Sequence, residues 1–160
     1  MQKQTVQFSY QVFASLDALS TPDRVLFVKA QEALALAHAP YSKFTVGVAL
    51  LLDNGVVVQG SNQENAAYPS GLCAERVAIF QSGTLYPEAK ILSMAITAAS
   101  DNNTTATPIP PCGACRQSIA EYELKQEKPI EIYFMGEIGA IYKSNSLKNL
   151  LPLMFDKNFL

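Results

Sequence analysis

The cysteines of this chain fall into two short motifs whose side chains suit a metal ion. Cys73 opens the run Cys-Ala-Glu-Arg, and Cys112 and Cys115 lie in the later run Pro-Cys-Gly-Ala-Cys-Arg; no other cysteine is present. A structural zinc site usually has four protein ligands, whereas a catalytic site has three and leaves one position for water. Three cysteines, with Glu75 two residues after the first, therefore indicate one zinc ion per chain that serves a reaction.

Glu75 is of the residue type that moves protons beside a metal. A zinc ion lowers the pKa of a bound water to about 7, and a nearby carboxylate can take that proton and pass it to a leaving amine. We therefore predict that Glu75 is the general acid and base. Residues two apart on a regular helix point in different directions, so Cys73 must lie at the extreme start of its helix to share a site with Glu75.

Two arginines directly follow motif residues. Three thiolates leave a zinc site with a net negative charge, so a positive neighbour should help. We predict that Arg76 and Arg116 support the ligands by donating to a thiolate sulfur; the alternative is an ordinary surface arginine. Gly113 is expected to leave room for close backbone approach, and Pro111 fixes the entry to the helix.

Simpler explanations of the cysteines weaken when the motifs are combined. Cys112 and Cys115 alone could be a redox pair, and Cys73 alone would usually be a small core residue. A closed structural site would need a fourth ligand. The one histidine, His38, falls at the end of a predicted helix, where it is more often solvated or capping than ligating.

The composition is that of one globular domain. The chain has 160 residues, nearly half apolar, and a net charge of −2; we expect a single domain over 1–160, with 1–20 as an N-terminal extension of unknown role. The charge offers no basic field for nucleic acid. No secretory signal or membrane-spanning run is found, so we expect no membrane partner and a cytoplasmic location, where thiols stay reduced.

Periodicity and turn signals predict strands that alternate with helices. Thr21 is the predicted cap of the first helix, and Gly83 is the predicted cap that ends the second. Residues 6–12 alternate apolar and polar and are either an edge strand or an irregular arm. Expected strands are 44–52, 56–58, 91–98, 130–135 and 138–142; expected helices are 21–38, 73–83, 112–124 and 147–151. The alternation implies one sheet covered on both faces.

At its motifs the chain resembles the cytidine deaminase family. The resemblance runs from about Pro40 to Pro152. It is carried by Pro-Tyr-Ser-Lys-Phe with Val-Gly (40–47), Asn-Gln-Glu-Asn-Ala-Ala-Tyr-Pro (62–69), Cys-Ala-Glu-Arg (73–76) and Pro-Cys-Gly-Ala-Cys-Arg-Gln (111–117). It implies an α/β fold with three α/β/α layers around a mixed sheet of about five strands. It also implies a homotetramer that hydrolyses cytidine and 2′-deoxycytidine to uridine and 2′-deoxyuridine with release of ammonia, in pyrimidine salvage.

The resemblance also implies roles for residues around the base and the sugar. The residue that matches Glu75 shuttles protons and holds the pyrimidine N3. Those that match Asn62 and Glu64 bind the ribose 3′-hydroxyl, as an amide and a carboxylate can. The aromatic that matches Phe44 packs against the base. In isolation, Asn62 and Glu64 would be common solvated loop residues, and Phe44 could belong to the core.

Three further residues are implied by the same resemblance. Ala66, through its backbone, and Tyr68 match residues that line the pocket, although Tyr68 could instead pack at a subunit contact. Phe155 follows Leu-Leu-Pro and resembles an aromatic that reaches into the neighbouring subunit's site in tetrameric members. An ordinary terminal aromatic is the alternative. The segment 99–110 is long and is expected to shape the site entrance.

Three rival functions remain open at this point. Asn62 and Glu64 argue against a deaminase of a related cytosine nucleoside antibiotic. Glu75 argues against a catalytically silent, zinc-stabilised binding module, which has no need of it. The acidic balance and the lack of an Arg/Lys-aromatic groove argue against a deaminase of nucleic acid polymers.

Overall fold

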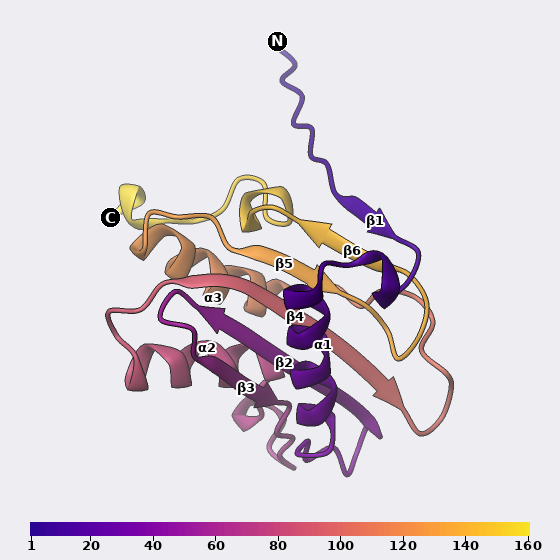
Figure 1. Ribbon diagram of the computed structural model, residues 1–160. Coiled ribbons are helices and arrows are strands. Elements are labelled where there is room, and N and C mark those ends of the chain that lie inside the picture. Colours follow the sequence, from indigo (N-terminus) through magenta and orange to yellow (C-terminus); the bar gives the residue numbers. More distant parts are fainter.

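A computed structural model describes residues 1–160 as a twisted sheet with helices on both faces (Figure 1). The six strands lie in the order β1-β6-β5-β4-β2-β3. They are β1 (Gln11–Phe13), β2 (Phe44–Leu52), β3 (Val57–Ser61), β4 (Ile91–Ser100), β5 (Glu131–Phe134) and β6 (Ile141–Ser144). Only β4 and β5 pair in parallel, which confirms a mixed sheet. About five strands were predicted; β1, from the alternating N-terminal segment, is the sixth.

Three α-helices complete the three layers. Helix α1 (Thr21–Leu34) crosses one face of the sheet, and α2 (Ala74–Leu85) and α3 (Gly113–Lys125) lie on the other (Figure 1). The chain also forms short 3-10 helices: η1 (Leu16–Ala18), η2 (Tyr68–Ser70), η3 (Leu147–Asn149) and η4 (Lys157–Phe159). None of the helices has the length and apolar character needed to cross a membrane.

Alternation along β2 builds a separate core on each face. Val48 and Leu50 belong to a cluster of 16 buried residues with α2 and α3, whereas Ala49 belongs to a cluster of 9 with α1. The α1 side needs small residues because the helix lies very close to the sheet. A Cβ at Gly47 would fall 2.1 Å from the carbonyl oxygen of Ala30, so the backbone of α1 rests directly on β2.

The first helix ends earlier than the sequence predicted, and its capping residue lies one position earlier. Ser20, not Thr21, is its N-cap: the Ser20 side chain accepts from the Asp23 amide, and its Oγ donates to Asp23 Oδ2 at 2.6 Å. The helix ends at Leu34 instead of His38. The backbone of His38 is instead bonded to the 62–64 segment, since its N–H donates to the Asn62 carbonyl and its carbonyl accepts from the Glu64 amide.

The prediction that Gly83 ends the second helix was also wrong. Helix α2 continues to Leu85. Gly83 lies close to α3: a Cβ there would lie 2.3 Å from the Tyr122 hydroxyl oxygen, so the tyrosine side chain would have to shift. The glycine marks a close helix–helix contact rather than a helix end.

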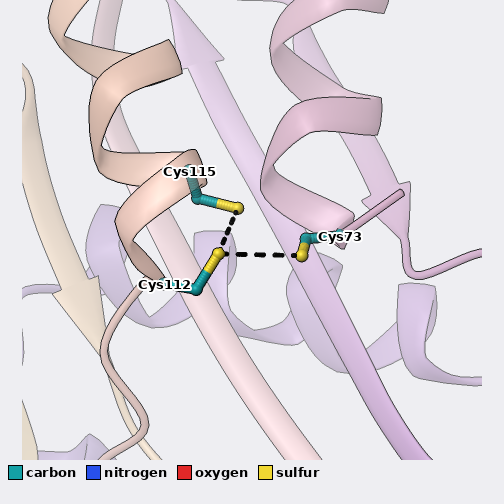
Figure 2. A group of neighbouring side chains, drawn as sticks. All are labelled: Cys73, Cys112 and Cys115. Carbon is teal, nitrogen blue, oxygen red and sulfur yellow. Dashed lines mark hydrogen bonds between the residues drawn. The ribbon is translucent and has the colours of Figure 1, made fainter. Parts of the chain in front are cut away.

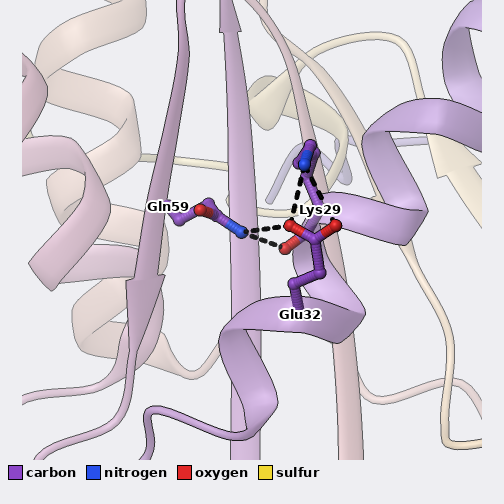
Figure 3. A network of polar contacts seen from close by, with 3 residues as sticks. All are labelled: Lys29, Glu32 and Gln59. Carbon is purple, nitrogen blue, oxygen red and sulfur yellow. Dashed lines mark hydrogen bonds and ion pairs between the residues drawn. The ribbon is translucent and has the colours of Figure 1, made fainter.

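A polar clip fastens the edge strand β3 to α1 (Figure 3). The Gln59 amide donates to the Lys29 carbonyl at 2.7 Å and to the Glu32 carboxylate at 3.4 Å. Lys29 and Glu32 form an exposed ion pair at 2.8 Å, which contributes ~0.5 kcal/mol or less. The clip fixes the strand that leads directly into Asn62.

Candidate active site

The three cysteine sulfurs lie together at the starts of α2 and α3 (Figure 2). Cys73 is the N-cap of α2, Cys112 is the N-cap of α3, and Cys115 lies in the first turn of α3. The Sγ atoms are 3.9 Å apart for Cys73 and Cys112 and 3.4 Å apart for Cys112 and Cys115, and all three lie within 4.8 Å of one another. Zinc–sulfur bonds of 2.3 Å in a tetrahedron require sulfurs about 3.8 Å apart. The donor set and its spacing therefore fit one zinc ion.

Two helix N-termini and an arginine favour thiolates at this cluster. The N-termini of α2 and α3 present their positive ends to the sulfurs. The pKa of Cys73 is lowered to about 5, first by the neighbouring Cys115 thiol and also by the Arg76 guanidinium. The pKa of Cys115 is raised, first by the neighbouring Cys73 sulfur and then by burial. Zinc binding as a trithiolate requires the remaining protons to leave.

Glu75 shares the site because Cys73 precedes the regular helix. Cys73 has extended dihedrals (φ −71°, ψ 152°), so its side chain is not bound by helical spacing. Glu75 follows in the first turn and is only 5% exposed, and both residues line the same cavity. Burial, followed by the charge of Cys73, raises the pKa of Glu75. Its carboxyl group therefore holds a proton more readily than a solvent-exposed glutamate does.

The two predicted supporting arginines behave differently. Arg76 Nη2 lies 3.8 Å from Cys73 Sγ, in line with the prediction, while its Nε is buried without a partner. Arg116 donates to no sulfur. Its Nε bonds the Pro111 carbonyl and its Nη1 bonds the Leu150 carbonyl, both at 2.8 Å. Arg116 therefore braces the backbone just before Cys112 and ties it to the C-terminal segment.

A cavity of about 800 Å³ opens beside the sulfurs. Of the predicted substrate contacts, Phe44, Asn62, Glu64 and Tyr68 line it, whereas Ala66 does not. The remaining lining residues are Tyr41, Ser42, Val46, Gln63, Asn65, Gly71, Leu72, Cys73, Glu75, Arg76, Ile96, Ile109, Pro110 and Cys112. Two of the three predicted metal ligands, Cys73 and Cys112, and the polar loop 62–65 thus belong to the wall of one cavity.

Asn62 clamps the start of β2. Its Oδ1 accepts from the Val46 amide at 2.8 Å, and its Nδ2 donates to the Phe44 carbonyl at 2.9 Å. Each end of the amide can form one more hydrogen bond. Asn62 thus fixes the strand that carries Phe44 and still retains bonding capacity at the cavity.

Glu64 is held as a carboxylate by backbone amides. Its Oε2 accepts from Tyr41 N–H at 2.9 Å and Ser42 N–H at 3.3 Å. The nearby Ser42 hydroxyl group and then the hydrogen bond from the Tyr41 amide lower its pKa. The other oxygen, Oε1, is left to accept from a ligand hydroxyl.

The sequence did not single out the apolar wall of the cavity. Leu72, Ile96, Ile109 and Pro110 line it, from the loop before α2, from β4 and from the long segment before α3. Ile109 and Pro110 directly precede the Pro-Cys motif, and this position in the sequence is the signal that could have identified them as cavity residues. The segment 99–110 was expected to shape the entrance, and these two residues are its contribution.

Phe155 lies apart from the cavity of its own chain. Its carbonyl accepts from the Gln117 side chain at 2.9 Å, and its ring stacks on Phe159 with centroids 5.7 Å apart. The side chain is 57% exposed. It does not line this cavity, so any role in catalysis would have to be at another chain.

Comparisons with known proteins agree with this geometry. The family model described as "Cytidine and deoxycytidylate deaminase zinc-binding region" matches residues 20–128. A cytidine deaminase of Halalkalibacterium halodurans is 39% identical over 83% of this chain and 94% of its own length, and one of Sporosarcina psychrophila is 37% identical over 82% and 90%. The crystal structure of cytidine deaminase from Burkholderia pseudomallei superposes with a TM-score of 0.71 at 33% identity, covering 86% of this chain and all of that one. The chain belongs to the cytidine and deoxycytidylate deaminase family.

Proposed function

We propose that the chain catalyses the zinc-dependent hydrolytic deamination of cytidine and 2′-deoxycytidine to uridine and 2′-deoxyuridine, with release of ammonia. The main support is one observation: the buried Glu75 and two cysteines of the zinc-sized three-sulfur cluster, Cys73 and Cys112, line the same cavity as Asn62 and Glu64. Relatives named cytidine deaminase support the same substrate.

Glu75 is the proton carrier in this proposal. The bound zinc would supply Lewis-acid activation of a water molecule. The reaction joins the water oxygen to C4 of cytosine and breaks the bond from C4 to the amino nitrogen. Glu75 carries the two protons of the water in turn: the first goes to N3, and the second, taken from the hydroxyl group formed on C4, goes to the departing nitrogen, which leaves as ammonia. Its raised pKa suits both directions of transfer.

The polar loop recognises the sugar and the apolar wall recognises the base. Glu64 Oε1 and the remaining hydrogen-bonding capacity of the Asn62 amide bind the ribose 3′-hydroxyl, and Phe44 packs against the pyrimidine. Tyr68 completes the pocket. Arg76, the one cationic lining residue, is directed to Cys73. The cavity wall offers no free cation for a 5′-phosphate, which favours nucleosides over nucleotides.

The proposal extends to the setting of the enzyme. It acts as a single domain over 1–160, assembles as a homotetramer and works in the cytoplasm in pyrimidine salvage. Phe155 reaches the cavity of a neighbouring subunit. The exposure of Phe155, and of Tyr68 (77%) at the cavity mouth, supports coverage of these rings by a second chain.

An ultraviolet assay of cytidine conversion, with and without a zinc chelator, tests the proposal. We expect conversion of cytidine and 2′-deoxycytidine that the chelator abolishes and added zinc restores. Faster turnover of a cytosine nucleoside antibiotic than of cytidine would favour the related antibiotic deaminase. Zinc-loaded protein that converts none of these compounds would refute the proposal and leave the silent binding module.

A further inference from the structure

The first ten residues project from the molecule and are not used by the proposed catalytic site. They run away from the sheet and end far from its other elements (Figure 1). Strand β1 (Gln11–Phe13), which directly follows these ten residues, pairs with β6. Strand β1 is last in the strand order, so its outer edge is unpaired.

The exposed segment has a regular apolar face. Val6, Phe8, Tyr10 and Val12 alternate with polar residues, and their side chains are 48–59% exposed. Val12 lies opposite Tyr142 of β6, and the Tyr10 ring stacks on Tyr142 with centroids 4.8 Å apart. The apolar face of the segment therefore continues the sheet face that carries Tyr142.

This edge lacks the features that keep sheet edges from pairing. Natural edge strands are usually protected by charges, proline, bulges or a covering element. From Gln4 to Leu16 the chain has no charged residue and no proline. An uncharged, β-prone edge is a ready template for strand addition.

The segment is complementary to itself. Residues 6–12 read Val-Gln-Phe-Ser-Tyr-Gln-Val, which is a palindrome centred on Ser9 apart from the exchange of Phe and Tyr. Two copies that pair antiparallel about Ser9 place Val6 opposite Val12 and Phe8 opposite Tyr10. Every apolar residue meets an apolar residue on one face, and Gln7 meets Gln11 on the other. A two-fold interface requires this reciprocity.

We propose that residues 6–12 pair antiparallel with the same residues of a second copy of this chain, joining the two six-stranded sheets edge to edge. The pairing hydrogen-bonds the free edge of β1 and covers the aromatic residues Phe8 and Tyr10 of both copies. The two folded bodies lie at opposite ends of the ribbon, because each is attached at the C-terminal side of its segment.

Cysteine cross-linking of the zinc-loaded full chain tests the register. Antiparallel partners have Cα atoms about 4.5–5.5 Å apart, within disulfide reach. Ser9→Cys should therefore give a covalent dimer under mild oxidation, with peptide mapping placing the bond between the two introduced thiols. Gln7→Cys is the matched control. Its own copies would be offset by about 13 Å along the strand, so it should not cross-link to itself.

A second pair of variants tests the apolar face in the Ser9→Cys background. Adding Phe8→Glu places a charge in the buried face and should lower the cross-link yield about tenfold or more. Adding Gln7→Glu places the same charge on the opposite face and should lower it far less. Absence of a Ser9→Cys cross-link, equal cross-linking by Gln7→Cys, or equal effects of the two glutamates would overturn the proposal. Cytidine conversion should be unchanged throughout, which separates this contact from the deaminase function.

Discussion

At the scale of single residues, the candidate site separates chemistry from recognition. Glu75 is buried beside the sulfurs, where its pKa is raised, whereas Glu64 is half-buried and bound by backbone amides, where its pKa is lowered. Both carboxyl groups line one cavity, and their pKa values are shifted in opposite directions. Such divergence is what separate roles in proton transfer and in hydroxyl binding require.

Replacing Glu75 by glutamine should abolish proton transfer without disturbing the metal ligands. The amide has the size of the carboxyl group but cannot carry a proton between water and substrate. We expect the rate constant for cytidine conversion to fall about 10²–10⁴-fold, with bound zinc and the melting temperature nearly unchanged. Zinc assay, calorimetry and kinetics check this, with the exposed Glu88→Gln as control. A Glu75→Gln enzyme with the original rate would contradict the assigned role.

Glu64→Gln should weaken substrate binding more than turnover. The amide oxygen can still accept from Tyr41 and Ser42 N–H, but the charged acceptor for a sugar hydroxyl is lost. A charge-assisted hydrogen bond contributes about 1.5–3 kcal/mol, so KM for cytidine should rise on the order of 10–100-fold. Steady-state kinetics separate KM from kcat. An equal loss for cytosine free base, which has no sugar, would contradict sugar recognition.

The lowered pKa of Glu64 predicts how binding depends on pH. A carboxyl group with a pKa below its usual value of about 4.3 is ionised at neutral pH and loses its charge only as the pH falls through that lower pKa. We therefore expect KM for cytidine to stay flat from about pH 7 to 5.5. Steady-state measurements across this range check it. A several-fold rise in KM within this interval that Glu64→Gln removes would contradict the assignment.

At the scale of elements, glycines decide how closely the helices that carry the ligands approach the sheet. A Cβ at Gly60 would lie 2.5 Å from the Ala74 carbonyl oxygen and 2.6 Å from the Ala78 amide nitrogen. Ala74 stands between Cys73 and Glu75, so this contact positions the first turn of α2. Gly113 lies between two metal ligands, yet a Cβ there would meet nothing within 4 Å.

Gly60→Ala should therefore damage the site from a distance, and Gly113→Ala should not. The first forces α2 away from β3 and should lower the free energy of unfolding by about 1–3 kcal/mol, with reduced zinc affinity. The second adds only a methyl group in open space at the start of α3. Denaturant unfolding and zinc titration compare the two. Greater damage from Gly113→Ala would show that the expected close approach at this glycine, rather than the contact at Gly60, governs the site.

Arg116→Lys should loosen the α3 side of the metal site. Lysine keeps the charge but cannot bond the Pro111 and Leu150 carbonyls together with one planar group. We expect a loss of about 1–3 kcal/mol in unfolding free energy and faster zinc release. Calorimetry and a zinc-release assay check this. An unchanged rate of zinc release would show that Arg116 stabilises the fold without affecting the metal site.

The elements that sequence periodicity predicted are those whose cause is local. Continuous apolar runs sufficed to predict β2 and β4, and the spacing of Cys112 and Cys115 sufficed to place them on one turn. The misjudged features depend on partners far along the chain. Leu34 ends α1 because the His38 backbone bonds residues 62 and 64, and Gly83 lies inside α2, where the Tyr122 side chain of α3 comes close to it. Arg116 was assigned to a sulfur because no local signal points to Leu150.

At the scale of the whole molecule, the metal cluster joins two helices that the core already holds. Helices α2 and α3 pack in the larger core through Ala78, Ile79, Ile119 and Ala120, and none of the three cysteines belongs to that cluster. The ion would thus add a cross-link at the helix starts rather than create the fold. A zinc finger, by contrast, unfolds without its metal.

Removal of zinc should accordingly leave a folded, inactive protein. We expect the far-ultraviolet circular dichroism to persist, cytidine conversion to stop, and the melting temperature to fall, because a ligand that binds only the native state stabilises it. Chelation followed by zinc repletion, monitored by calorimetry and activity, checks all three. A chelated chain that loses its helical signal would contradict the view that the core alone maintains α2 and α3.

The clamp formed by Asn62 has a consequence for how this pocket can change over evolution. The amide that would contact the sugar also fixes the Phe44 carbonyl and the Val46 amide, and thereby the strand that presents an aromatic ring to the base. A substitution at Asn62 would therefore change sugar discrimination and pyrimidine binding together. A lineage that altered its sugar preference by replacing Asn62 would loosen base stacking in the same step, so a new sugar specificity is more accessible through Glu64.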